Sequence, residues 1–419
     1  MINVAVLYKS SFAPRSTWIG TLSILFAFIL LQPIAHAEIE VDARFPGGNI
    51  IVDRVEENDV YIHQDLRDTK GDWFYWYFRV RGAEGKTVRF HFTKSNVIGV
   101  LGPAYCRDGQ NWHWLGKHAV EEKTFSFSFK KTDRAARFCF AIPYTQSNLD
   151  AFLDRYQENP QFQVDTLCTT KKGRKVERIL LGCLSREPAA KVLLTCRHHA
   201  CEMMASYTLE GMMESILTDR ANRWLKHNVE FMVIPFVDTD GVEDGDQGKN
   251  RRPRDHNRDY AGESIYSSVK HLREWVPTWS DGKLRVAIDM HDPYIRGNMN
   301  EKIYFVCGPD EANSKNILQY SDFLEHVTQQ RNISNKECLL FYTKNVLPWD
   351  TAWNKPENYT QGKSNARWTS ELPGIWFGST IEIPYANAEG RAVTAESARW
   401  LGRDMATALR MYLQKKLKP

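Results

Sequence analysis

The chain lacks several features that would place it outside the ordinary globular class. It has no collagen repeat, coiled-coil heptads, mucin-like tract, low-complexity segment or internal repeat. No C-x-x-C pair occurs among its eight cysteines, which argues against a zinc ribbon or a thioredoxin-like redox site. Lys and Arg are interleaved with Asp and Glu, so we do not expect a nucleic acid as partner. A length of 419 residues with ordinary apolar content therefore predicts two domains and little disorder.

The chain also lacks an apolar run near its N-terminus that reaches the roughly 20 residues of a membrane-spanning helix. The run at residues 19–31 is shorter, follows Lys9 and Arg15, and precedes the triplet Ala-His-Ala at 35–37. This order is typical of a secretory signal peptide, residues 1–37, and we expect cleavage after Ala37 rather than retention as an anchor. Loss of the two basic residues takes the formal charge from +4 to +2. The protein is then exported, periplasmic or secreted, with no stable membrane anchor.

All eight cysteines follow this segment. An exported protein can oxidise them, so we expect some disulfides. Their spacing does not define which cysteines pair. They are Cys106, Cys139, Cys168, Cys183, Cys196, Cys201, Cys307 and Cys338.

Residues 38–150 are predicted to form a small all-β sandwich domain. Segments 73–81, 86–93 and 125–129 read as strands, and the last alternates Phe with Ser, which indicates one buried and one wet face. Residues 82–85 are predicted to be the hairpin connection between the first two strands. Because no long helical pattern interrupts the region, two packed sheets are the expected arrangement.

Residues 151–419 are predicted to form an α/β domain. After a linker helix at 147–156, apolar strands alternate with helices, and a final helix begins near Thr394. This alternation indicates a layered domain with a largely buried sheet. The predicted strands are 191–196, 229–237, 284–290, 302–307 and 380–384.

A histidine pair and a glutamate follow the strand at 191–196 and precede a predicted helix at 203–217. The carboxyl ends of strands in open α/β sheets are where ligands gather. His199 and Glu202 are three residues apart and can point the same way. Imidazole and carboxylate suit Zn²⁺, which in catalytic sites has three protein ligands and one open position. His198 is four residues from Glu202 and would share its helix face, so it stays an alternative.

A third donor is predicted at His291, which ends the strand at 284–290. Asp289 and Asp292 flank it and can hold its second ring nitrogen. The three donors would hold one zinc ion per chain. An H-x-x-E match is weak on its own, because chance spacings are common.

A single carboxylate, Glu382, lies within the apolar strand at 380–384. Glutamate is almost never fully buried unless it is paired, so we expect Glu382 at a cleft. An arginine-rich segment, residues 251–260, follows an Asp-Gly turn at 240–241. Planar guanidinium groups suit a substrate with a free carboxylate. The alternative for this segment is a solvated basic loop balanced by its own aspartates.

The order of these motifs, over residues 197–385, resembles the zinc metallocarboxypeptidases of the carboxypeptidase A type. The resemblance implies a mixed-sheet catalytic domain and a role for each matching residue. It implies that the zinc ligands are His199, Glu202 and His291. It further implies that Asn257 and Arg258 form the clamp for the substrate's terminal carboxylate and that Glu382 is the general base. It also implies an arginine that stabilises the oxyanion.

Arg251 is the best match for that arginine, and Arg252 and Arg254 are competing registers. The chain is most similar to the cytosolic carboxypeptidase branch, which carries a β-sandwich ahead of the catalytic domain and a P-Y-T-x-S-x-L segment like that at 143–149. Three departures occur: Ala-Cys replaces Pro-Gly between the first two ligands, Asp-Thr replaces Asn-Pro before the Asp-Gly turn, and a signal peptide is present. A signal peptide does not fit the tubulin-tail substrates of the cytosolic branch.

The resemblance implies hydrolysis of the C-terminal bond of a peptide or protein by an activated water, with Glu382 as base. One alternative is a zinc amidase that acts on peptidoglycan peptides or acyl-amino acids. Another is an inactive secreted binding protein, which would require the loss of a ligand or of the base.

Overall fold

The computed structural model describes residues 38–418. The predicted signal peptide, residues 1–37, lies outside this part of the chain. Within residues 38–418, no helix combines the length and the apolar character that crossing a membrane requires. All of these residues belong to one compact unit.

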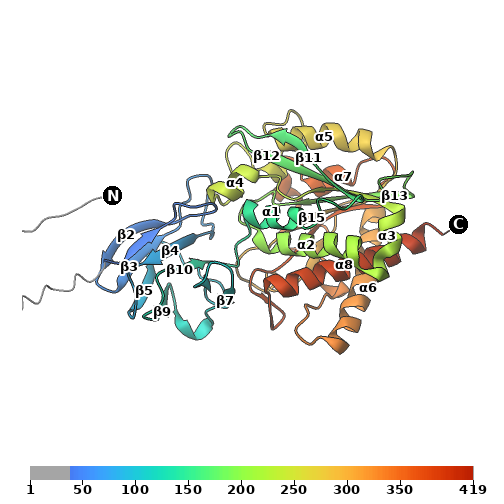
Figure 1. The fold of residues 1–419 in the computed structure, drawn as a ribbon. Helices are drawn as coiled ribbons and strands as arrows, with labels where there is room; N and C mark the ends of the chain where they lie inside the picture. The colour runs from blue at the N-terminus through green and yellow to red at the C-terminus, as the bar shows by residue number, and fades with distance from the viewer. Residues whose placement is uncertain (1–37, 419) are drawn as a thin grey trace, which may run out of the picture. The chain divides into compact units, whose positions relative to one another are not determined.

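The described chain begins with two five-stranded sheets, drawn in blue to teal in Figure 1. The first has the order β1 (Glu40–Asp42), β4 (Tyr77–Arg81), β10 (Ala136–Cys139), β6 (Ala104–Cys106) and β7 (Trp112–Trp114). The second has the order β2 (Ile51–Glu56), β3 (Asp59–His63), β5 (Thr87–Phe92), β9 (Thr124–Ser128) and β8 (Val120–Glu121).

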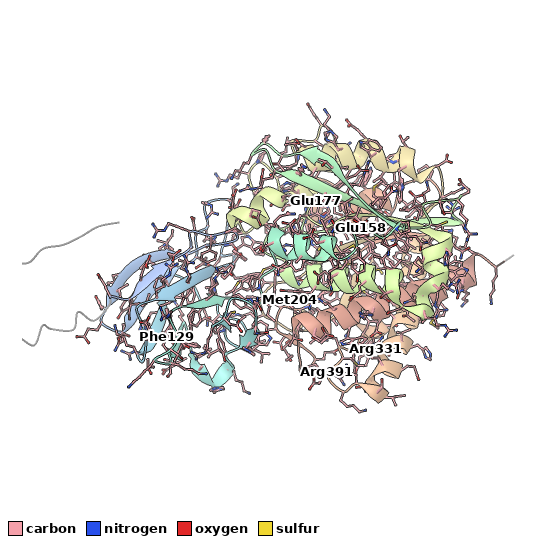
Figure 2. The ribbon with its side chains drawn as sticks, in the orientation of Figure 1. Phe129, Glu158, Glu177, Met204, Arg331 and Arg391 are labelled. Atoms are coloured by element: carbon pink, nitrogen blue, oxygen red, sulfur yellow. The ribbon has the colours of Figure 1, made fainter. Side chains whose placement is uncertain are left out.

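Aromatic side chains fill the space between these two sheets. Phe78 of β4 lies 5.4 Å, centroid to centroid, from Phe90 of β5, and Phe138 of β10 lies 5.6 Å from Phe125 of β9. Such pairs add to the free energy gained by burying the rings. Phe129, labelled in Figure 2, packs on Phe127 at 4.9 Å. The predicted sandwich is confirmed.

The predicted hairpin between residues 73–81 and 86–93 is wrong. β4 pairs with β1 and β10, whereas β5 pairs with β3 and β9 in the other sheet. Gly82 and Gly85 both have positive φ, +70° and +75°, which lets the chain turn sharply between the strands. The turn leads the chain from one sheet to the other, and both strands bury one face in the shared core.

The second part of the fold is a seven-stranded mixed sheet, which confirms the predicted α/β class. Its order is β11 (Phe162–Thr169), β12 (Lys175–Gly182), β14 (Val229–Ile234), β13 (Ala190–Cys196), β15 (Leu284–His291), β17 (Phe377–Glu382) and β16 (Tyr304–Val306). The four central strands β14, β13, β15 and β17 run parallel to one another. β12 pairs antiparallel with β14 and with β11, and β16 pairs antiparallel with β17. A two-stranded ribbon, β18 (Asn387–Ala388) and β19 (Arg391–Ala392), follows.

Helices cover both faces of this sheet (Figure 1). One face packs against α2 (Met203–Thr218), α6 (Glu311–Ser334) and α8 (Ala395–Lys416). The other packs against α5 (Ser267–Ser280) and α7 (Asn365–Thr369). The shorter helices are α1 (Gln146–Asp154), α3 (Arg223–Asn228) and α4 (Thr239–Asp244). Burial on both faces explains the near-continuous apolar sequence of the parallel strands.

The register of the parallel strands decides where the functional groups meet. His291, the last residue of β15, pairs directly with Glu382, the last residue of β17. Cys196, which ends β13, pairs with Met290 on the other side of β15. The three strand ends that carry the predicted ligands and base therefore lie side by side at one edge of the sheet.

Candidate active site

Three side chains converge where β13 and β15 end. Donor atoms of His199, Glu202 and His291 all lie within 4.8 Å of one another, and all three residues are buried. The Glu202 carboxylate lies between the rings, with Oε1 2.9 Å from Nδ1 of His199 and Oε2 2.6 Å from Nδ1 of His291. The predicted triad is thus brought together, with one donor atom from each residue in a single cluster.

This donor set fits zinc. Two imidazole nitrogens and one carboxylate are the ligands of a catalytic site that keeps an open position. The other ring nitrogen of His291, Nε2, lies 2.7 Å from Oδ2 of Asp289, which fixes the ring and leaves Nδ1 toward the other donors. The predicted support of His291 by a flanking carboxylate is present. The second flanking carboxylate, Asp292, instead accepts the backbone N–H groups of Met204 (labelled in Figure 2) and Ala205 in the first turn of α2.

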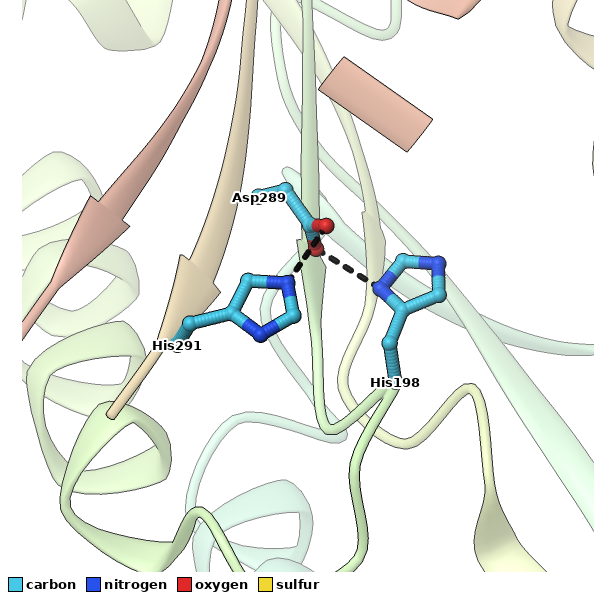
Figure 3. Close-up of side chains that lie close together, drawn as sticks. All are labelled: His198, Asp289 and His291. Atoms are coloured by element: carbon cyan, nitrogen blue, oxygen red, sulfur yellow. Dashed lines mark hydrogen bonds and ion pairs between the residues drawn. The ribbon is translucent and has the colours of Figure 1, made fainter. Parts of the chain in front are cut away.

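His198 belongs to a second group of donors, with Asp289 and His291. Figure 3 shows His198 and His291 on either side of the Asp289 carboxylate, which contacts both rings. Nδ1 of His198 lies 2.7 Å from Asp289, and its Nε2 lies 2.7 Å from the hydroxyl of Tyr260. Both ring nitrogens are therefore engaged inside the protein, and the ring does not line the cavity described next. The geometry favours His199 over His198 as the ligand.

A cavity of about 550 Å³ opens onto the triad. His199, His291 and Glu382 line it together. Glu382 is only 7% exposed, and its Oε2 has no hydrogen-bond partner among the described residues. Burial raises the pKa of this carboxyl to about 7. A carboxylate that ionises near neutrality beside a metal-binding triad has the properties of a general base.

The predicted carboxylate clamp lines the same cavity. Asn257 is buried, and its Nδ2 lies 3.2 Å from Nε2 of His291. Arg258 donates to the backbone carbonyls of Asn257 and Asn358, and its guanidinium lies 5.2 Å from the ring centroid of Tyr359. No described carboxylate forms an ion pair with Arg258, so its charge is free to bind an anionic ligand.

Arg251 does not join the other predicted site residues. Its guanidinium binds three carboxylates, those of Asp68, Asp238 and Asp246, at 3.0, 2.9 and 2.8 Å. It lines a separate cavity of about 180 Å³. With its donors already engaged, it has no group directed at a substrate carbonyl beside the triad.

The two competing registers do not reach the cavity either. Arg254 pairs with Asp259 and donates to the carbonyl of Glu263, and Arg252 is exposed. None of the three arginines lines the cavity that holds the triad. The oxyanion role therefore has no geometric support at any of these positions.

Two cavity residues were missed by the sequence analysis. Lys249 places its Nζ 2.7 Å from Oε1 of Glu202. Asp255 has an oxygen 3.7 Å from Nε2 of His199, and this histidine lowers the pKa of the carboxyl although burial opposes the shift. The signal for both was their position just ahead of Asn257 and Arg258, but the loop has no periodicity that would orient single side chains.

All eight cysteines are buried free thiols, so the expected disulfides are absent from the described residues. Cys201 sits between two predicted ligands, yet its sulfur contacts the hydroxyl of Tyr385 at 3.8 Å. Burial raises the pKa of this thiol to about 12. Cys201 belongs to neither of the two donor groups described above and is a buried core residue.

Comparisons with known proteins agree with this geometry. Residues 149–371 match the zinc carboxypeptidase family, and residues 41–141 match the cytosolic carboxypeptidase N-terminal domain. The chain is 23% identical over 232 residues to an uncharacterized protein of Zymomonas mobilis, covering 53% of this chain and 60% of that protein. It is 25% identical over 287 residues to cytosolic carboxypeptidase 3 of Mus musculus, covering 59% of this chain and 28% of that protein.

A solved structure shares the fold. The metallo-carboxypeptidase from Burkholderia cenocepacia superposes with a TM-score of 0.73 at 18% identity, covering 90% of this chain and 99% of that chain. The matches span 60% of the Zymomonas mobilis protein and 28% of the mouse protein, less than two thirds of each. The matches confirm the resemblance drawn from the order of the motifs.

Proposed function

Because the chain belongs to the zinc carboxypeptidase family, we propose that it hydrolyses the C-terminal peptide bond of peptides or proteins. The observation that carries the proposal is the placement of Arg258, without a carboxylate partner, in the cavity that also holds the triad and Glu382. A charge-assisted pair between a guanidinium and the substrate's terminal carboxylate would select chain ends. The clamp makes the enzyme an exopeptidase, whereas the triad alone would fit many hydrolases.

The side chains divide the reaction between them. Arg258 and Asn257 hold the terminal carboxylate and so fix the scissile carbonyl in the cavity. A zinc ion held by His199, Glu202 and His291 would supply Lewis acidity and lower the pKa of a water molecule. Glu382 takes a proton from the attacking water and returns it to the leaving amine, serving first as base and then as acid.

A panel of peptides tests this function against its alternatives. The zinc-loaded protein is incubated with ordinary peptides, peptidoglycan stem peptides and acyl-amino acids, with and without a chelator. We expect release of single C-terminal residues from ordinary peptides and loss of this activity with the chelator. Cleavage of only the stem peptides or acyl-amino acids would support an amidase. No cleavage by protein with bound zinc would support a binding protein.

We also propose that the protein is exported, with its mature chain starting at Glu38, a sandwich domain to about residue 150 and a catalytic domain from 151. The order of basic residues, apolar run and small-residue triplet in residues 1–37 supports export. Cell fractionation and N-terminal sequencing test it. A full-length chain that stays in the cytoplasm would overturn it.

A further inference from the structure

The loop at residues 246–251 lies directly against the segment that carries the ligands. Gly248 has a φ of +80°, and a Cβ at this position would lie 2.1 Å from the backbone nitrogen of Ala200 and 2.9 Å from the Cα of His199. Such a distance leaves no room for a side chain, so the loop backbone touches the residue that bears a ligand. The position of this loop is therefore coupled to the metal site.

Asp68, from the N-terminal domain, holds the other side of the same loop. Its Oδ1 accepts the backbone N–H of Gln247 at 3.0 Å, and its Oδ2 accepts the backbone N–H of Gly248 at 2.9 Å. Oδ2 also accepts from Nε of Arg251 at 3.0 Å. The carboxylate is 10% exposed, so these charge-assisted bonds are little screened by water. The loop is clamped between the two domains.

Lys249 is the residue that this clamp presents to the cavity. Its ammonium lies 2.7 Å from Oε1 of Glu202 and 5.1 Å from the ring centroid of Trp73 in the N-terminal domain. The side chain is 14% exposed. Among the described residues that line the cavity, only Lys249 and Arg258 carry a permanent positive charge. Because Arg258 belongs to the carboxylate clamp, Lys249 is the cation that remains for the scissile carbonyl.

We propose that Lys249 is a catalytic residue whose ammonium stabilises the negative charge developing on the substrate carbonyl oxygen, and that Asp68 positions it. The proposal rests on the proposed function. When the water oxygen bonds to the carbonyl carbon, the π electron pair moves to the carbonyl oxygen. The ammonium donates a hydrogen bond to that oxygen, and the pair returns as the C–N bond breaks. A preorganised cation gains most at this stage because the charge exists only then.

A merely structural role for Lys249 makes a different prediction. If the ammonium only secured Glu202, its removal would weaken zinc binding and leave the rate per bound zinc unchanged. If it stabilises the oxyanion, its removal lowers the rate while zinc stays bound. Measuring zinc content together with kcat and KM separates the two roles.

The main test compares Lys249→Met with wild type on one blocked dipeptide. We expect kcat to fall about 10²- to 10³-fold, as for loss of an oxyanion donor. KM should change by less than about threefold, since the interaction is made only in the transition state. Zinc content should stay equal to that of wild type. The inhibition constant of a substrate analogue with a phosphonate in place of the scissile amide should rise in parallel with the loss of kcat.

Chemical rescue links the effect to the charge. In Lys249→Cys, 2-bromoethylamine alkylates the thiolate with loss of bromide and rebuilds an ammonium at the same chain length. The native cysteines are all buried, which favours reaction at the introduced thiol. We expect most of the lost kcat to return, whereas alkylated wild type stays unchanged. Lys70→Met, which removes an exposed charge from the adjoining segment of the N-terminal domain, is the matched control and should keep the wild-type rate.

Asp68 is tested by a double-mutant cycle. Asp68→Asn should lower kcat about 10- to 100-fold, because displacing the loop misplaces the ammonium. In the Lys249→Met background the same change should cost less than about threefold, since the group that it positions is gone. Asp72→Asn, an exposed carboxylate in the same segment, is the control and should keep the wild-type rate.

The outcomes separate this inference from the proposed function. If wild type does not hydrolyse the dipeptide, the proposed function fails. If wild type hydrolyses it but Lys249→Met has the same kcat, or loses activity only in proportion to its zinc, Lys249 is not catalytic. If the effects of Asp68→Asn and Lys249→Met multiply independently, Asp68 does not act through Lys249.

Discussion

Replacing Glu382 by Gln removes the proposed base without changing the shape of the cavity. The side chain is 7% exposed, and its Oε2 has no hydrogen-bond partner among the described residues, so the amide breaks no such bond at that atom. Arg258 and Asn257 still hold the substrate's carboxylate, and KM should therefore stay nearly constant. General-base catalysis contributes about 10²- to 10⁴-fold, which is about 2.7–5.4 kcal/mol at 1.36 kcal/mol per tenfold. We expect kcat to fall by that factor.

The pH profile provides a second measure of the same substitution. Burial raises the pKa of Glu382 to about 7, and the positive charge of bound zinc lowers it, so the acid limb of kcat/KM should lie at or below about pH 7. Because a base works only when deprotonated, activity falls as pH falls through this pKa. The limb should disappear in Glu382→Gln. Stopped-flow hydrolysis of a blocked dipeptide from pH 5 to 9, with zinc content checked, measures both. A variant with wild-type kcat and an unchanged acid limb would refute the assignment.

Other consequences follow from the clamp, the charge network and the metal. Arg258→Met should lower kcat/KM about 10- to 100-fold, from the 1.5–3 kcal/mol of a charged hydrogen bond, and an unchanged value would remove the basis for exopeptidase specificity. Arg251→Met leaves the poorly exposed carboxylates of Asp68 and Asp238 without this cation, whereas Asp246 keeps its ion pair with Arg67. Urea unfolding should therefore show a loss of about 3–5 kcal/mol, and equal stability would contradict the network. Chelation should abolish hydrolysis, and added zinc should restore it. Burial raises the pKa of Asp404 to about 7 although Arg331 (Figure 2) opposes the shift. The folded carboxyl then keeps a proton that the unfolded one releases near pH 4, so stability should fall as pH rises from about 4 to 7. Asp404→Asn should flatten that dependence in urea unfolding, and parallel profiles would contradict it.

The functional residues at the ends of the strands could be predicted from the sequence, because each directly follows or closes an apolar segment of the chain. His291 and Glu382 each close an apolar strand, and parallel pairing of β15 and β17 places them side by side. The ligand pair His199 and Glu202 follows β13 in the same way. The adjacency of the strands follows from the fold, but the residue types at their ends are visible in the chain itself.

Loop geometry could not be predicted in this way. Arg251 matched an expected position, yet its partners include Asp68, which lies 183 residues away in the sequence. The position of Lys249 ahead of Asn257 and Arg258 did not define where its side chain points, since one lysine in an irregular loop has neither periodicity nor a neighbour that fixes its direction. β11, at one edge of the sheet, and its neighbour β12 were also missed. β11 is mostly exposed and polar, so it lacks the apolar run that identified the central strands.

The passage of the chain from β4 in one small sheet to β5 in the other could not be predicted from the glycine-containing turn at residues 82–85. A short Gly-rich connection between two alternating segments is typical of a hairpin. Alternation indicates which face is buried, but both sheets of a sandwich bury a face in the same core. The sequence pattern therefore could not tell whether the second strand pairs with the first or packs against it.

The most direct test of the account is hydrolysis of one peptide offered as the free acid and as the C-terminal amide, followed by mass spectrometry. If Arg258 binds a terminal carboxylate in the cavity of the zinc triad, the zinc-loaded protein removes one residue from the acid and leaves the amide intact. Cleavage of both forms at the same rate, or cleavage at internal bonds, would contradict the central claim.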